Sequence, residues 1–211
     1  IYNENPKTNQ TKTIIFSPPN ISGECSIPND VTIIGKSSFI KRENLKSIAI
    51  GPKLQKIESN AFFNCQNLEK ISIKETPSLF LGQYSFARSQ KLKTVEIESQ
   101  EIEIGEKSFS DCVLLETVLV SKVNNIILQS YAFKNCSHLK NISFCYELEQ
   151  HNTNTNSTFD VSKIKSIKID QYCFLNCIAL VSVDFSDIEN IDLSSKIFEG
   201  CINLDSVKIN N

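Results

Sequence analysis

The sequence predicts a repeat solenoid of the α/β class with about seven stacked units. The main observation is a phenylalanine that recurs at steps of 23, 24, 23, 24, 41 and 24 residues. Further columns of apolar residues keep the same register, and each unit contains an alternation of polar and apolar residues. A fixed period in the twenties is typical of a solenoid whose units each contribute one strand and one return segment.

The recurring columns carry aromatic, cysteine and leucine side chains, and the string from Phe62 to Ile73 shows them most clearly. The first column is Phe39, Phe62, Phe86, Phe109, Phe133, Phe174 and Phe198. Three residues later stand Cys65, Cys112, Cys136, Cys177 and Cys201, with Arg42 and Ser89 as exceptions. Six residues after the phenylalanine stand Leu45, Leu68, Leu92, Leu115, Leu139, Leu180 and Leu204. A lone unit cannot bury these side chains, so the columns predict a core that forms by stacking.

Each unit is expected to contain a strand, a turn, a second aliphatic segment and a compact return piece. Residues 70–73 alternate as a strand with one buried face does, and Pro28, Pro52 and Pro77 break the strand in three units. The second segment carries the column Ile34, Ile57, Leu81, Ile104, Leu128, Ile169 and Leu193. The glycines that follow it, Gly35, Gly82 and Gly105, are interpreted as turn geometry. The piece at 58–62 favours a single helical turn or a 3₁₀ segment because it is too short for a long helix.

Three regions depart from the regular repeat. Residues 1–24 form a polar flank, in which Phe16 stands 23 residues before Phe39 and marks a degenerate capping repeat. The solenoid itself occupies 25–211, and its 41-residue step exceeds the neighbouring step of 24 by 17 residues. We expect the polar run at about 146–163 to form an insertion loop. The final strand has no polar cap, so either more repeats follow it or this end meets a partner, including a second copy of the chain.

The composition is that of a folded domain, with 40% hydrophobic residues, 22% charged residues and a net charge of −2. This balance argues against a nucleic acid or an acidic membrane surface as partner. No stretch approaches the roughly 18 apolar residues of a membrane-spanning helix, so direct membrane insertion is not expected. The chain has no methionine and no secretory leader, which favours a processed or trimmed piece whose export route is not visible.

Eight cysteines raise the question of disulfides, and the repeat register favours thiols. Five of them share one column, Cys25 falls at an inward strand position, and Cys173 takes the place of a small residue. These seven are predicted to be small buried side chains, a role that free cysteine fills well. Cys145 is expected at an outward strand position. Column neighbours such as Cys112 and Cys136 could come close enough to bridge, so the disulfide alternative stays open.

The sequence gives little support for catalysis, a metal or a cofactor. Of two histidines, His138 is expected in a solvent-facing turn and His151 in the insertion, and neither pairs with a nucleophile in a recognisable motif. No phosphate-binding or dinucleotide-binding glycine string occurs. Cys173 and Cys177 have metal-like proximity, but repeat columns explain both and no second ligand pair accompanies them. We therefore expect no catalytic residues, no metal and no cofactor.

These columns resemble the BspA-like class of leucine-rich repeats. The resemblance runs from about Cys25 to Ile209 and is carried by the recurring string Phe-x-x-Cys-x-x-Leu-x-x-Ile-x-Ile. It implies a right-handed leucine-rich-repeat superhelix with a parallel β-sheet on its concave side and short helical or 3₁₀ return segments. It also implies a surface protein of the adhesin type, although leucine-rich repeats host many unrelated binding roles. The departures are the insertion and the missing cysteine in the units of Phe39 and Phe86.

Outward strand positions would line the concave face of such a solenoid. They combine small polar side chains, opposite charges and one apolar residue, and solenoids hold extended partners on such faces. The candidate binding residues are Lys70, Ser72, Lys74, Thr94, Glu96, Thr117, Leu119, Asn141, Ser143 and Asp184. The alternative is an ordinary solvated sheet face. The mixed charges disfavour a phosphate backbone as ligand.

Two functional hypotheses follow. The first is a non-enzymatic adhesion module, at the cell surface or extracellular, that binds a host matrix protein or a protein of a neighbouring cell. The second is an intracellular scaffold that holds a cytoplasmic partner. The Asn-x-Ser/Thr sites at Asn20 and Asn156 would carry glycans if the protein is secreted. Glycan at Asn156 would favour the first hypothesis, and free core thiols without glycans would favour the second.

Overall fold

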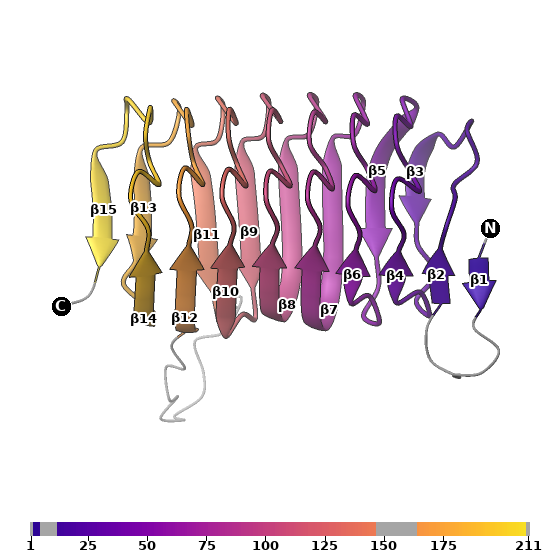
Figure 1. Ribbon diagram of the computed structural model, residues 1–211, viewed down its shortest axis with the longest axis horizontal. Coiled ribbons are helices and arrows are strands. Elements are labelled where there is room, and N and C mark those ends of the chain that lie inside the picture. The colour runs from indigo at the N-terminus through magenta and orange to yellow at the C-terminus, as the bar shows by residue number, and fades with distance from the viewer. Residues whose placement is uncertain (1, 5–11, 147–163, 210–211) are drawn as a thin grey trace, which may run out of the picture.

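The chain forms an elongated stack of turns with the N-terminus at one end and the C-terminus at the other (Figure 1). This computed structural model describes residues 2–4, 12–146 and 164–209. Its strands are β1 (Tyr2–Glu4), β2 (Lys12–Ile14), β3 (Gly23–Ser26), β4 (Ile33–Ile34), β5 (Leu45–Ile50), β6 (Lys56–Ile57), β7 (Lys70–Leu81), β8 (Thr94–Ile104), β9 (Thr117–Ser121), β10 (Asn125–Leu128), β11 (Asn141–Cys145), β12 (Ile164–Ile169), β13 (Ser182–Phe185), β14 (Ile188–Leu193) and β15 (Ser206–Ile209). The expected repeat solenoid is confirmed.

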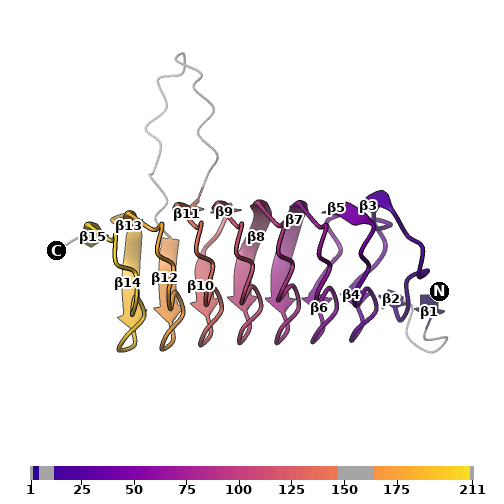
Figure 2. The same cartoon turned by 90° about the horizontal axis from the view of Figure 1, so that it is seen from above.

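Two rows of parallel strands run along the stack and form two sides of each turn (Figure 2). The first row contains β3, β5, β7, β8, β9 and β11, followed by β13 and β15 as a separate two-stranded sheet. The second row contains β2, β4, β6, β7, β8, β10, β12 and β14. β7 and β8 belong to both rows because each is long enough to pair along two sides of the turn. At the N-terminal end, β1 pairs antiparallel with β2.

The return segments differ from the expected helical or 3₁₀ pieces. The aliphatic segment before each phenylalanine belongs to the second row of strands, and no helix occurs within the described residues. The amides of Asn60, Phe62 and Asn64 donate hydrogen bonds to carbonyls of the next turn. Those of Ala61 and Phe63 donate to the carbonyl three residues earlier. A helix needs successive amides to bond within its own segment, so this alternation excludes one.

Left-handed backbone at two positions per turn also prevents a helix. Two residues before the phenylalanine, φ is positive at Ser37, Asn60, Tyr84, Lys107, Tyr131, Tyr172 and Lys196. Two residues after it, φ is positive at Lys41, Asn64, Arg88, Asp111, Asn135, Asn176 and Gly200. A β-branched side chain is strongly disfavoured in this conformation, and none occurs at these positions. Sharp reversals of the chain therefore frame each buried phenylalanine.

The phenylalanine column forms one continuous stack in the core. Consecutive ring centroids from Phe39 to Phe198 lie 4.7 to 5.5 Å apart. The long step in the sequence leaves the stack intact, because the rings of Phe133 and Phe174 are 5.4 Å apart. The leucine column is fully buried except at its last member, Leu204, which is partly buried. The predicted core is confirmed, and the burial of the phenylalanine and leucine columns weakens only in the last turn.

The side chains three residues after each phenylalanine all donate a hydrogen bond to a backbone carbonyl of the preceding turn. The thiols of Cys65, Cys112, Cys136, Cys177 and Cys201 each donate to the phenylalanine carbonyl of the preceding turn, at 3.1 to 3.3 Å. Ser89 Oγ donates to the carbonyl of Phe62 at 3.4 Å in the same way. The Arg42 guanidinium donates to the carbonyl of Ser17, at 2.8 Å. The two exceptions in this column therefore keep the donor that cysteine supplies elsewhere.

Replacing Cys112 by serine is expected to destabilise the fold less than replacing it by alanine. Serine keeps a donor for the carbonyl of Phe86, as Ser89 does for Phe62, whereas alanine removes it. Loss of a neutral hydrogen bond costs about 0.5–1.5 kcal/mol. Urea unfolding of both variants measures the difference. A serine variant less stable than the alanine variant would show that apolar burial alone determines this column.

At the N-terminal end, β2 extends the second row. Ile14 pairs in register with Ile34 and is 4% exposed. Phe16 is 45% exposed, and the Arg42 guanidinium lies over its ring at 5.2 Å from the centroid. Phe16 therefore does not extend the buried stack in the way that Phe39 does. The assignment of residues 1–24 as a capping repeat stays a prediction.

Candidate binding surface on the first row

The outward side chains of the first row form one surface, which we call the first-row face. Sheet register places four candidate residues side by side, namely Ser72, Glu96, Leu119 and Ser143. The neighbouring line on the same strands is Lys70, Thr94, Thr117 and Asn141. Alternation in the sequence predicted these lines, and the structure brings their members together across β7, β8, β9 and β11.

Opposite charges on the first-row face pair across neighbouring strands. Lys70 Nζ lies 2.7 Å from Glu96 Oε1, and Lys208 Nζ lies 3.5 Å from Asp184 Oδ2. Both pairs are partly or largely exposed, so each contributes at most about 1 kcal/mol to stability. Because the charges are paired, the face has little net field. We therefore expect that any partner of this face would be recognised by contact and charge pattern rather than by bulk attraction.

A more buried carboxylate, Glu98, stands at the edge of this face and is 7% exposed. Lys74 Nζ lies 2.6 Å from one of its oxygens, and Lys122 Nζ lies 3.0 Å from the other. The hydrogen bond from Lys74 holds the pKa of Glu98 below its usual value, and the one from Lys122 adds to this while burial opposes it. Glu98 is thus an ionised carboxylate that holds the side chains of two lysines in place. Its pKa is not raised as that of a general acid would be.

The centre of the first-row face is neutral and carries small side chains. Thr94, Thr117 and Leu119 are half-buried, and Asn141 and Ser143 are exposed. Small side chains allow another chain to approach the strands closely. Leu119 adds an apolar contact in the middle of the polar surface. The strip formed by Thr94, Thr117 and Leu119 therefore suits an extended polypeptide.

Asp184 shares the direction of the face but not the same sheet. It lies on β13, which pairs with β15, and no ladder joins β13 to β11. Asp184 Oδ1 accepts hydrogen bonds from the amide and hydroxyl of Ser186, and these bonds lower the pKa of its carboxyl group. The structure therefore groups nine of the ten candidate residues on one sheet and places Asp184 beyond a break in the row.

The remaining predicted positions divide between the described residues and the rest of the chain. Asn20 is exposed in a turn, as a glycan acceptor must be. His138 is exposed in a turn as expected, with Nδ1 2.8 Å from the carbonyl oxygen of Val113. Asn156 and His151 lie outside the described residues, as do residues 147–163 of the predicted insertion at about 146–163.

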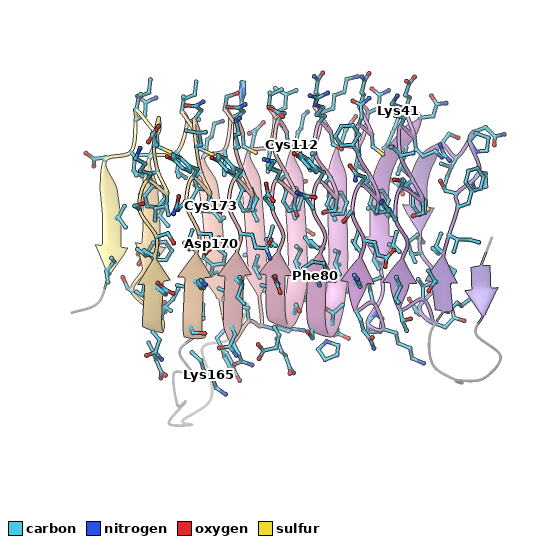
Figure 3. All side chains as sticks on the ribbon, viewed as in Figure 1. Lys41, Phe80, Cys112, Lys165, Asp170 and Cys173 are labelled. Carbon is cyan, nitrogen blue, oxygen red and sulfur yellow. The ribbon has the colours of Figure 1, made fainter. Side chains whose placement is uncertain are left out.

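The fully buried thiols do not have the features of a reactive site. Cys65, Cys112, Cys136, Cys173 and Cys177 are buried free thiols, with Cys112 and Cys173 inside the stack in Figure 3. Cys25 and Cys201 are half-buried rather than buried as expected, because they belong to solenoid turns near the two ends of the stack. Burial raises the pKa of Cys112 to about 12, so this thiol stays protonated and unreactive at neutral pH. The described residues contain no group of three or more His, Cys, Asp or Glu side chains that could hold a metal ion.

Sequence reasoning missed a second exposed surface and one lysine. The outward residues of the second row lie in register at Lys56, Phe80, Glu103, Ile127 and Lys168. Lys56 Nζ lies 5.7 Å from the ring centroid of Phe80, which Figure 3 labels, and Ile127 is 38% exposed. The signal was the alternation of outward and inward residues before each phenylalanine, which a helical return segment does not need. The lysine that was missed is Lys122, the second partner of Glu98. It follows β9 in left-handed backbone and belongs to none of the repeat columns.

Stacked phenylalanines, parallel strand rows and a period in the twenties together define a leucine-rich-repeat solenoid. A family model for the BspA type leucine-rich repeat region matches residues 10–140, 79–170 and 158–211, with six copies. The chain belongs to this BspA-type leucine-rich repeat family. Repeat proteins of this family are generally protein-interaction scaffolds rather than enzymes. No helix in the described part of the chain is long and apolar enough to cross a membrane.

A solved structure of a leucine-rich repeat protein shares the fold. A leucine-rich repeat protein from Eubacterium ventriosum matches with a TM-score of 0.69 and 24% identity, over 91% of this chain and 46% of that protein. The present chain thus spans about half the length of that relative. A leucine-rich cell surface protein from Faecalibacterium prausnitzii matches with a TM-score of 0.45 and 17% identity, over 100% of this chain and 93% of that protein. At such identities a likeness concerns the fold alone, and no curated protein sequence matches the chain.

Proposed function

We propose that this chain is a non-enzymatic adhesion module that binds an extended segment of a host protein or of a neighbouring cell's protein on its first-row face. The observation that carries the proposal is the neutral strip at Thr94, Thr117 and Leu119, bordered by the Lys70–Glu96 pair. A strand row of this kind offers close approach, one apolar contact and a defined charge pattern. Family membership supports protein binding in general, and the strip supports this surface in particular.

The double charge swap Lys70→Glu with Glu96→Lys is expected to weaken partner binding by tenfold or more while the melting temperature stays unchanged. The swapped side chains can still pair with each other, as the present ones do at 2.7 Å, so the fold keeps its contact. The partner meets the inverted pattern, and like charges across an interface oppose binding strongly. Affinity is measured by biolayer interferometry against the matrix or surface protein that the wild-type chain captures, and stability by thermal unfolding.

A matched control exists on the opposite side of the molecule. Lys56 and Glu58 form a 3.6 Å pair in the second row, with side-chain exposures of 44% and 36%, against 48% and 34% for Lys70 and Glu96. The swap Lys56→Glu with Glu58→Lys should leave affinity unchanged. Unchanged affinity in the first-row variant, or an equal loss in the control, would rule out the first-row face as the binding surface.

Surface display is the second part of the proposal and is supported by the family resemblance rather than by the geometry. Intact source cells are treated with a membrane-impermeant amine reagent, and the protein is then captured and tested for label. Labelled protein is the expected result and leads to a screen of host matrix proteins. The contradicting result is a labelled surface marker together with an unlabelled cytosolic marker and no label on this protein. The hypothesis of surface display would then be rejected, and the intracellular scaffold would become the better hypothesis.

A further inference from the structure

Aromatic and cationic side chains follow one another along the return pieces, which lie after the second-row strands in the upper half of Figure 1. The column two residues before each phenylalanine supplies Tyr84, Lys107, Tyr131, Tyr172 and Lys196 on consecutive turns. Lys107 Nζ lies 5.4 Å from the ring centroid of Tyr84 and 5.4 Å from that of Tyr131. The rings of Tyr131 and Tyr172 are 5.2 Å apart and nearly parallel, at 5°. Lys196 Nζ lies 5.5 Å from the ring centroid of Tyr172.

Three further side chains join this column. The ring of Phe63 meets that of Tyr84 edge-on, at 6.4 Å and 85°. The Arg88 guanidinium lies 5.7 Å from the ring centroid of Phe63, and Lys134 Nζ lies 5.8 Å from that of Tyr131. We call the column from Tyr84 to Lys196 together with Phe63, Arg88 and Lys134 the return strip. It forms an unbroken chain of side-chain contacts along the stack.

The rings of the return strip cover their faces and leave edges in solvent. Tyr131 has Tyr172 and Lys107 over its ring, and Tyr172 has Tyr131 and Lys196. A ligand that stacks on aromatic faces, as nucleic-acid bases do, therefore finds these faces occupied. The tyrosine rings are half-buried, so part of each ring edge stays accessible. Because the edge of an aromatic ring carries its positive potential, these edges and the neighbouring ammonium groups all favour an anion.

The charges of the return strip are only partly neutralised. Lys107 Nζ lies 2.8 Å from Glu106 Oε1, and Lys196 Nζ lies 3.5 Å from Glu199 Oε2. Arg88, which is exposed, and Lys134, which is half-buried, form contacts to aromatic rings but no ion pair with any described residue. Asp111 on the same return pieces accepts a hydrogen bond from Asn135 Nδ2 at 2.8 Å. Two cations are therefore available to a ligand.

We propose that the return strip binds an extended acidic segment of a protein partner, with carboxylates about three residues apart. Arg88 and Lys134 stand on turns separated by one other turn, which places them about 10 Å apart along the stack. Three residues of an extended chain span about the same distance. Glu106 and Glu199 oppose a polymer with dense negative charge, such as a nucleic acid, whereas a polypeptide can place neutral residues opposite them.

The return strip is separate from the first-row face. Its side chains belong to the return pieces, whereas Lys70 and Glu96 lie on β7 and β8. The proposal therefore does not depend on the proposed function. The charge-swapped variant of Lys70 and Glu96 should bind an acidic peptide as the wild type does, so failure of either surface can be recognised without the other.

The test uses an acetylated and amidated twelve-residue peptide with glutamate at every third position and serine elsewhere. It is titrated at low salt into the whole chain labelled with ¹⁵N, and amide chemical shifts are followed. Exposed charge pairs are weak, so we expect a dissociation constant on the order of 1 mM, with shifts concentrated on the return pieces. The same peptide with glutamine in place of glutamate should cause no shifts.

The double variant Arg88→Gln with Lys134→Gln is expected to weaken binding of the glutamate peptide about fivefold. The matched control is Lys46→Gln with Lys93→Gln. Lys46 and Lys93 are exposed, form no ion pair with any described residue and also stand on turns separated by one other turn, and their loss changes the net charge equally. This control should keep wild-type affinity. If the strip variant has a lowered melting temperature, the single variant Lys134→Gln, with an expected twofold loss, replaces it.

Three results would overturn the proposal. The first is no binding of the glutamate peptide, or equal binding of the glutamine peptide. The second is an equal loss of affinity in the strip variant and the control, which would mean attraction by net charge alone. The third is binding of heparin at the return strip without binding of the peptide, which would assign the strip to a sulfated polysaccharide.

Discussion

Replacing Phe109 by alanine is expected to lower the free energy of unfolding by about 3–5 kcal/mol. The ring is 0% exposed and lies 5.2 Å from the ring of Phe86 and 5.3 Å from that of Phe133. Its removal leaves a cavity between two aromatic neighbours. The flanking turns cannot close this cavity, because strand ladders in both rows fix their spacing at about 4.8 Å.

Urea unfolding followed by circular dichroism measures the loss, and Phe16→Ala is the matched control. Phe16 is 45% exposed beside Arg42, so its truncation is expected to cost no more than about 1 kcal/mol. The stability of a solenoid is the sum of the contributions of its units and of the interfaces between them. Loss of one ring in the middle of the stack can therefore split the unfolding transition in two. Equal stability of the two variants would show that the phenylalanine stack does not determine the stability of the fold.

The core was predictable because each column repeats one kind of side chain in register. Phe133 and Phe174 stack at 5.4 Å although 41 residues separate them, as the phenylalanine register requires. The second row of strands was not predictable in the same way. β4 and β6 each contain two residues, too few for periodicity to distinguish a strand from a turn. Pairing with neighbouring turns makes these segments strands, and that information is tertiary.

The candidate surface was predictable where the strands alternate and not where the sheet is interrupted. Alternation placed Lys70 near Glu96, and the structure pairs them at 2.7 Å. The break in the first row depends on how β11 and β13 pack. Its one local signal is that Phe144 and Phe185 stand where other units have isoleucine or valine, and the effect of such bulk on strand spacing is set by the surrounding core.

Replacing Gly105 by alanine is expected to destabilise the fold by about 1–3 kcal/mol. We expect the cost to lie near the upper end of this range. A methyl group there would lie 2.4 Å from the carbonyl oxygen of Leu81 and 3.2 Å from the carbonyl carbon of Gly82. Both atoms belong to the backbone, and the amide of Gly105 donates to that same oxygen at 2.8 Å. The glycine column therefore reflects close approach between turns. It does not reflect positive φ, which occurs instead at Gly23 and Gly200.

Asparagine substitutions distinguish these two reasons for glycine. At Gly23, φ is +69° and nothing lies within 4 Å of an added Cβ, so Gly23→Asn should be tolerated because asparagine adopts left-handed backbone at little cost. Gly105→Asn should be at least as destabilising as Gly105→Ala, because the clash begins at Cβ whatever follows it. Thermal unfolding of the variants measures both effects. A stable Gly105→Asn variant would mean that the turns can separate at this point, and the close contact between them would then not be required for stacking.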